Sequence, residues 1–218
     1  MLLAVVATGC GSSTSAGTPT PTTGSTNTTT TTTVPPTTTT DPGLLPQTSD
    51  EPPVDASLRA TLAPLWSAIT SGSPATGMSV FFPRPAYLQM KTGVLPDPGA
   101  DYTGRLVAFY GLDIAAYHQA LGAGAASATL VSVDASPSDA AWIAVGSCEN
   151  RTGYWHLPGV RLVYEEGGAV QSFAVASLIS WRGVWYVVHL GPNPRPADVG
   201  TVDQPAQGAG TPGPAGGC

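Results

Sequence analysis

Residues 160–190 read VRLVYEEGGAVQSFAVASLISWRGVWYVVHL and decide the fold class. Most of this stretch alternates with a period of two or runs as apolar sequence rich in Val, Ile, Trp and Tyr, as β-strands do. Two short turns that contain glycine, at 165–168 and 182–183, interrupt it. Such turns between strand-like runs are typical of β-hairpins. The stretch therefore predicts antiparallel strands at 160–164, 169–181 and 184–190.

The sequence before residue 127 has the helical period instead. One apolar helical face is formed by Leu58, Leu62, Leu65, Trp66 and Ile69. Asp55 is placed to cap this helix and Gly72 to end it, whereas Pro64 predicts a kink or a late start.

Shorter patterns of the same period predict further helical segments at 85–93, 101–110 and 113–122, with Gly111 separating the last two. After residue 127 the period changes to two, and additional strands are expected at 129–133 and 142–145. Helices followed by antiparallel strands predict an α+β fold, in which N-terminal helices pack on an antiparallel β-sheet.

The chain begins with a short apolar run, MLLAVVATGC, that ends at Cys10. Small residues before a cysteine resemble the lipobox of bacterial lipoprotein signal peptides, in which the signal is cut before the cysteine and acyl chains are attached to it. The resemblance implies that residues 1–9 are a signal peptide, shortened at its start, and that Cys10 is lipidated. An extracytoplasmic protein anchored to the outer face of the cell membrane is expected, with the membrane as a partner through these acyl chains.

A polar segment follows Cys10. Thr makes up sixteen of residues 11–40, and this part of the chain carries no charge. Such a composition has too little apolar surface to offset the entropy of ordering, so residues 10–54 are expected to be a disordered tether. Residues 55–190 have the composition of a single globular domain, and residues 191–218 form a tail rich in Pro and Gly.

The three cysteines suggest one disulfide. If Cys10 carries lipid, Cys148 and Cys218 remain, and in an oxidising compartment these two are expected to pair. A zinc site needs more Cys or His ligands at short spacing, so neither a metal nor another cofactor is expected. His118, His156 and His189 are the only histidines, and their spacing favours structural or surface roles.

The charge balance restricts the partners. The net charge is −6, and Lys91 is the single lysine. Nucleic acids and anionic membrane surfaces require clustered Lys and Arg, so neither is expected to bind. A cell-wall component or another protein is the remaining candidate.

The closing hairpin Ser180-Trp181-Arg182-Gly183-Val184-Trp185-Tyr186-Val187-Val188, preceded by N-terminal helices, resembles the NTF2-like (cystatin-like) superfamily. The resemblance covers roughly residues 55–190 and implies a curved sheet with a conical pocket between sheet and helices. Some members bind or isomerise small apolar molecules there. The stretches at 82–91 and 153–161 also resemble uncharacterised actinobacterial lipoproteins, a group that implies no activity.

The residues themselves favour a filled core over such a pocket. Tyr87, Tyr110, Tyr117 and Tyr164 could line a cavity, but neither face of the strand at 169–181 carries a carboxylate that could act as a base. The pattern Gly-x-Ser-x-Gly of many hydrolases is also missing. No catalytic residue is therefore assigned.

A loop before the hairpins is the best candidate interaction surface. It combines charged and aromatic residues, which are common in binding loops: Glu149, Arg151, Tyr154, Trp155 and His156. The alternative is a hairpin loop whose Trp155 folds back on the core. Two functions stay open. The first is a lipid-anchored, non-enzymatic binding or interaction module, and the second is an NTF2-like domain that binds or converts a small ligand in a pocket.

Overall fold

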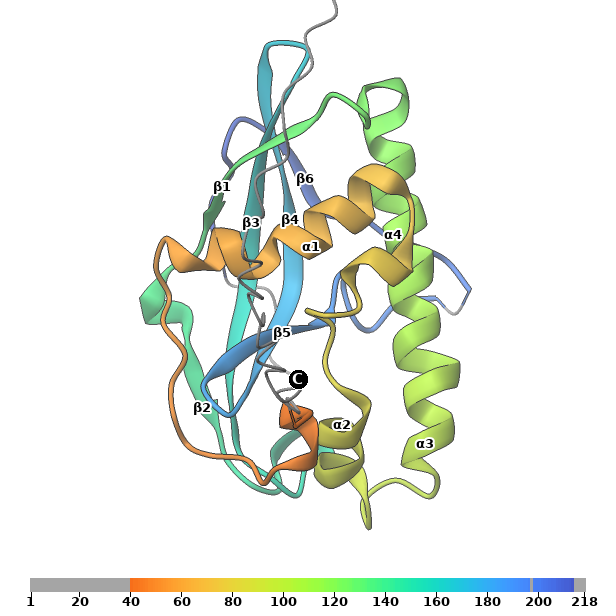
Figure 1. Cartoon of the computed structure of the whole chain (residues 1–218), viewed down its shortest axis with the longest axis vertical. Helices are drawn as coiled ribbons and strands as arrows, with labels where there is room; N and C mark the ends of the chain where they lie inside the picture. The colour runs from red at the N-terminus through yellow and green to blue at the C-terminus, as the bar shows by residue number, and fades with distance from the viewer. Residues whose placement is uncertain (1–39, 197, 214–218) are drawn as a thin grey trace, which may run out of the picture. The chain divides into compact units, whose positions relative to one another are not determined.

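The computed structural model describes residues 40–196 and 198–213, which form an α+β domain. Its centre is a sheet of six strands: β1 (Thr129–Asp134), β2 (Ala141–Ile143), β3 (Tyr154–Glu166), β4 (Ala169–Trp181), β5 (Val184–His189) and β6 (Asp203–Gln207). The sheet is open and curved, and every pairing between these strands is antiparallel (Figure 1). The predicted α+β class and the antiparallel pairing are confirmed.

The two predicted hairpins hold the centre of the sheet. β3 pairs with β4 from Glu166↔Ala169 to His156↔Ile179, and β4 pairs with β5 up to Trp181↔Val184. β1 and β2 do not pair with each other, because both lie along β3. β1 pairs with residues 161–165 and β2 with residues 154–156.

β3 runs through Pro158. Pro158 lies between the parts of β3 that β1 and β2 pair with. A proline at this point removes no hydrogen bond to either strand, which is the condition under which a sheet tolerates it. The strand therefore begins at Tyr154, six residues before the predicted start.

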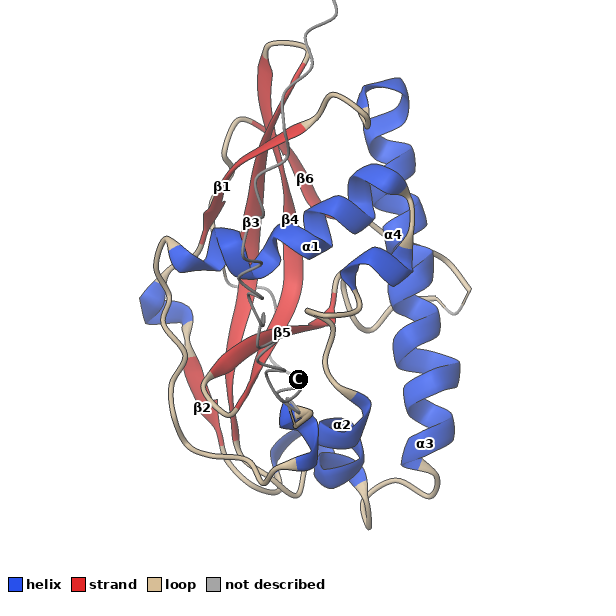
Figure 2. Cartoon of the chain, viewed as in Figure 1, coloured by secondary structure: helices blue, strands red, loops and turns tan. Residues whose placement is uncertain are grey.

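The helices cover one side of the sheet (Figure 2). They are α1 (Ser57–Ser71), α2 (Arg84–Lys91), α3 (Pro98–Asp101) and α4 (Ala108–Leu121). α1 crosses the sheet in Figure 1, and its buried side chains are the predicted apolar face together with Ala68. Pro64 lies inside α1 without delaying its start, and Gly72 ends it in the left-handed conformation, with φ 64°. The predicted helix and its C-terminal glycine are confirmed.

Gly111 does not interrupt the next helices. α3 continues into a π-helical turn, Tyr102–Val107, and then into α4, so residues 98–121 form one helical run. π-turns are rare and are often found at functional sites, because the extra residue changes which side chains face the protein. Here Arg105 and Leu106 of this turn reach the cavity described below.

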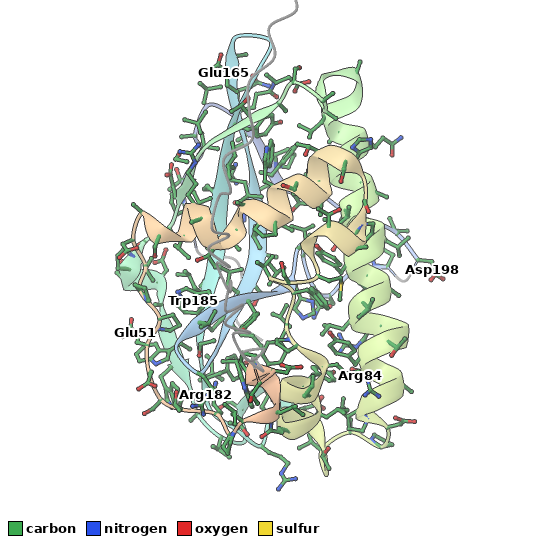
Figure 3. The ribbon with its side chains drawn as sticks, viewed as in Figure 1. Glu51, Arg84, Glu165, Arg182, Trp185 and Asp198 are labelled. Carbon is green, nitrogen blue, oxygen red and sulfur yellow. The ribbon has the colours of Figure 1, made fainter. Side chains whose placement is uncertain are left out.

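The packed domain begins near residue 40 and not at residue 55. A strap, residues 41–54, lies against the strands and is held by three tryptophan indoles. The Nε1 groups of Trp181, Trp155 and Trp185 donate to the carbonyl oxygens of Pro42, Ser49 and Pro53, each at 3.0 Å. Figure 3 shows Trp185 on the side of the domain where the strap carries Glu51.

Part of the predicted tail also belongs to the domain. Residues 203–207 form β6. β6 pairs with residues 171–174 of β4, and β5 pairs with residues 177–181 of the same strand. Arg195 forms a buried ion pair with Asp113 of α4, and the Asp113 carboxylate accepts hydrogen bonds from the backbone N–H groups of Gly191 and Thr201. The segment after β5 is thus fixed by strand pairing and charge, so the domain extends beyond the predicted boundary at residue 190.

Candidate functional site

A cavity of about 640 Å³ lies between the helices and the sheet. α2 and the π-turn form one wall, and β3, β4 and β5 form the other. Cavities of this size hold small organic molecules in many proteins. Its apolar lining is contributed by Met90, Leu95, Leu106, Ile143, Ala176, Ile179, Val188, Pro192 and Pro194. The prediction of a filled core is therefore wrong at this end of the domain.

Three polar side chains form a cluster on the helical wall. Asp101 and Arg105 are one helical turn apart, and the Arg105 Nε and Nη2 groups each donate to Asp101 at 2.7 Å. The Tyr87 hydroxyl donates to Asp101 and accepts from Arg105 Nη2 at 3.0 Å. The hydrogen bonds from Arg105 keep the pKa of Asp101 below its usual value. Burial, together with the bond to Asp101, raises the pKa of the Tyr87 hydroxyl.

Two imidazoles face this cluster from the sheet. His156 of β3 lies with Nε2 at 2.7 Å from the Ser177 hydroxyl of β4, and His189 stands at the end of β5, paired with Ser177 through the backbone. Burial lowers the pKa of His156. The pKa of His189 falls to about 4, because the imidazole is buried and cationic side chains surround it. Both histidines are therefore neutral near pH 7.

Two further polar residues complete the wall. Lys91 of α2 donates to the carbonyl oxygens of Cys148 and Glu149 at 3.1 Å, and burial lowers its pKa. Asn150 is 5% exposed and donates to the Tyr154 hydroxyl at 3.3 Å, but no donor within the described part of the chain reaches its Oδ1 atom. A buried acceptor without a donor costs free energy, and a ligand with an N–H or O–H group would satisfy it.

The predicted interaction surface is divided by the alternation of β3. Tyr154 and His156 point into the domain and line the cavity, whereas Trp155 lies on the other face, half-buried against Trp142 and bonded to the strap. Glu149 and Arg151 remain exposed beside the cavity mouth. These five residues do not form one exposed surface, which corrects the prediction, and Trp155 has the alternative role in which it folds back on the domain.

The other predicted residues have different positions. Of the four tyrosines proposed for a cavity, only Tyr87 lines it. Tyr110, Tyr117 and Tyr164 are buried in the hydrophobic core. His118 lies outside the cavity with Nδ1 at 3.0 Å from the Ile69 carbonyl oxygen, so it joins α4 to the end of α1. Within residues 40–196 and 198–213, no three side chains among His, Cys, Asp and Glu are grouped as a metal site.

Cys148 is disulfide-bonded and lies on the cavity wall. Its predicted partner, Cys218, lies outside the described residues, as does Cys10, so the Cys148–Cys218 pairing stays a prediction. A disulfide here restricts the short loop that contributes Cys148, Glu149 and Asn150 to the cavity.

Asp101, Arg105 and His189 were not predicted as residues of this site. A usable signal was the i, i+4 spacing of Asp101 and Arg105, which places opposite charges on one face of a helix. Among the described residues, no helix has both the length and the apolar composition needed to cross a bilayer. Comparison with protein-family models, curated protein sequences and solved structures finds no match to this chain.

Proposed function

We propose that this protein is a lipid-anchored, extracytoplasmic binding protein of the NTF2-like type that holds a small ligand between its helices and its curved sheet. The cavity is the observation that carries the proposal. It combines an apolar lining with polar groups that converge from α2, the π-turn and three strands. This is the usual composition of a small-molecule site, in which apolar contacts supply affinity and a few polar groups fix orientation.

The polar cluster supports binding more than catalysis. A carboxylate that acts as a general base needs a pKa near the working pH and a free oxygen. Asp101 has neither, because Arg105 contacts both of its oxygens and lowers its pKa. A reaction that uses Asp101 as its general base would require Arg105 to move away from the carboxylate, and nothing in the structure favours such a movement.

Filling the cavity should abolish ligand binding. Ala176 of β4 lines the cavity, so an Ala176→Phe side chain would occupy space that a ligand needs. We expect the wild-type protein to enhance the fluorescence of the uncharged apolar dye N-phenyl-1-naphthylamine, and the variant to lose at least about tenfold in affinity, since clashes in a packed site cost a few kcal/mol.

Ala169→Phe is the matched control, because Ala169 is exposed on the same strand. This control should bind the dye like the wild type. Equal dye affinity in both variants, with both folded by circular dichroism, would contradict ligand binding in this cavity.

The membrane anchor rests on the sequence at Cys10. Replacing Cys10 by Ala, in a gene with a complete signal peptide upstream, should move the protein from the membrane fraction to the soluble fraction. The acyl chains supply the membrane affinity in this proposal, at about 0.8 kcal/mol for each buried CH₂ group. Detergent-phase partitioning measures the effect, with Ser12→Ala as the control. A variant that still partitions into detergent would refute the anchor without bearing on the cavity.

A further inference from the structure

His189 is one of the polar side chains that line the cavity. It lies at the end of β5 and lines the cavity, yet it makes no hydrogen bond with any residue in the described ranges. His156, by contrast, is joined to Ser177. A half-buried imidazole that has neither a donor nor an acceptor beside it is available to a ligand.

The charges around His189 are mostly positive. Arg105 from the π-turn, Lys91 from α2, Arg195 from the segment after β5 and His156 from β3 all disfavour a proton on His189. The carboxylates nearby are already engaged or exposed. Asp101 is bound by Arg105, Asp113 by Arg195, and Glu149 lies at the surface beside Lys91. Within the described part of the chain, no carboxylate raises the pKa of His189 against these cations.

A cavity with this arrangement favours a negative charge on its ligand. Arg105 keeps its Nη1 group without a hydrogen bond to any described residue, while its Nε and Nη2 groups hold Asp101. Arg105 and His189 thus line the same cavity, and each keeps a hydrogen-bonding group that no described residue uses. In a partly enclosed cavity, an anion gains more from such groups than it would in bulk water.

We infer that the cavity binds a small amphiphilic monoanion, with its charged group against His189 and Arg105 and its apolar part along Leu106, Ile179 and Val188. This inference rests on the proposed function. The formal charges of Lys91 and Arg105 are balanced by those of Asp101 and Glu149. One proton taken up by His189 would therefore neutralise one negative charge on the ligand, and a dianion would remain unbalanced.

Binding should consequently be linked to a proton. In the free protein, burial and the neighbouring cations hold the pKa of His189 at about 4. An anion in contact with the imidazole favours its charged form and raises this pKa. The bound state then holds more protons than the free state, so affinity must increase as the pH falls from neutrality toward the pKa of the free protein.

Calorimetric titration of the full chain carrying Cys10→Ala tests this with two probes of equal chain length. Decanesulfonate keeps its charge throughout the pH range, and decanol has none. We expect decanesulfonate to bind at least about tenfold more tightly at about pH 5.5 than at about pH 7.5, with proton uptake seen in buffers of different ionisation enthalpy. Decanol should bind with the same affinity at both pH values.

Histidine variants assign the proton. His189→Gln should abolish the pH dependence and the proton uptake of decanesulfonate binding. His118→Gln, at a histidine outside the cavity, should behave like the wild type. Loss of proton uptake in His156→Gln but not in His189→Gln would overturn the assignment to His189.

Two outcomes separate this inference from the proposed function. In the first, decanol binds and Ala176→Phe weakens its binding, but decanesulfonate binds no more tightly than decanol and shows no pH dependence. This result would overturn the inference of a monoanion and leave the ligand cavity in place. If neither probe binds and Ala176→Phe has no effect on the uncharged dye, the proposed function itself fails.

Discussion

Replacing Asp113 by Ala is expected to lower the free energy of unfolding by about 3–5 kcal/mol, the range found when one partner of a buried ion pair is removed. Asp113 is 2% exposed, and its carboxylate joins three groups of the segment after β5: the Arg195 guanidinium and the backbone N–H groups of Gly191 and Thr201. The substitution leaves a buried positive charge and two buried donors without an acceptor. Urea unfolding followed by tryptophan fluorescence measures the loss.

The pKa of Asp113 shows that this loss comes from breaking the pair and not from a strong net attraction. Burial raises this pKa above its usual value, although the hydrogen bonds and Arg195 act in the opposite direction. The cost of desolvation therefore exceeds the gain from the contacts. Between the unfolded and the folded pKa, the unfolded state has lost its proton while the folded state still holds it, so the stability that this group contributes falls as the pH rises through this interval.

A double variant provides the control. Asp113→Asn retains an oxygen that can accept from the two backbone N–H groups, and Arg195→Met removes the charge while keeping contact with Phe109, over which the guanidinium lies at 4.2 Å. Exchanging both members of a buried pair for uncharged groups is often close to neutral. We expect the double variant to recover most of the stability that Asp113→Ala loses. A double variant as unstable as the single one would contradict this account of the pair.

Replacing Trp181 by Ala should also cost about 3–5 kcal/mol, as truncation of large buried aromatic side chains does. Trp181 is fully buried at the end of β4, where its ring meets Phe82 edge to face with centroids 6.0 Å apart. Its indole N–H also holds the strap through the Pro42 carbonyl oxygen. The variant therefore creates a cavity and releases the beginning of the strap.

Two comparisons separate these effects. Trp142 is 41% exposed, so Trp142→Ala should cost less than about 1 kcal/mol. Trp181→Phe keeps most of the buried ring but removes the N–H donor, so it should cost roughly 1–3 kcal/mol. Thermolysin digestion should cut both Trp181 variants faster than the wild type at Leu44 and Leu45, which are exposed on the strap. Equal cleavage rates would show that the indole does not hold the strap.

The sequence by itself determined the class of fold and most of its central elements. The strand at 169–181 coincides with β4, and α1 ends at Gly72 as predicted. Both are local features. An alternating apolar pattern between glycine turns buries one face only when the segment is a strand. A glycine in the left-handed conformation ends a helix through its own backbone geometry.

The strap and β6 could not be predicted, because neither has an apolar pattern of its own. Residues 41–54 are held by tryptophan side chains of distant strands, whose indole N–H groups donate hydrogen bonds to backbone carbonyl oxygens. Every residue has such a carbonyl oxygen, so these bonds require no particular sequence in the strap. β6 contains Pro205, and its residues Gln204 and Pro205 are exposed, so only the free edge of β4 makes it a strand. Backbone pairing of this kind depends on the shape of the partner and leaves little trace in composition.

The tertiary structure alone decided the site. Tyr87, Asp101, Arg105, His156 and His189 come from α2, the helical run, β3 and β5. Tyr87 and His156 were candidates in the sequence, but no pattern in it places these five residues together. Their meeting depends on the π-turn that contains Arg105, on the alternation of β3 that turns His156 inward, and on the packing of the helices and the curved sheet around the cavity. Each of these is a property of packed elements and not of a local stretch of chain. For this reason the sequence predicted a filled core where the folded protein has a cavity.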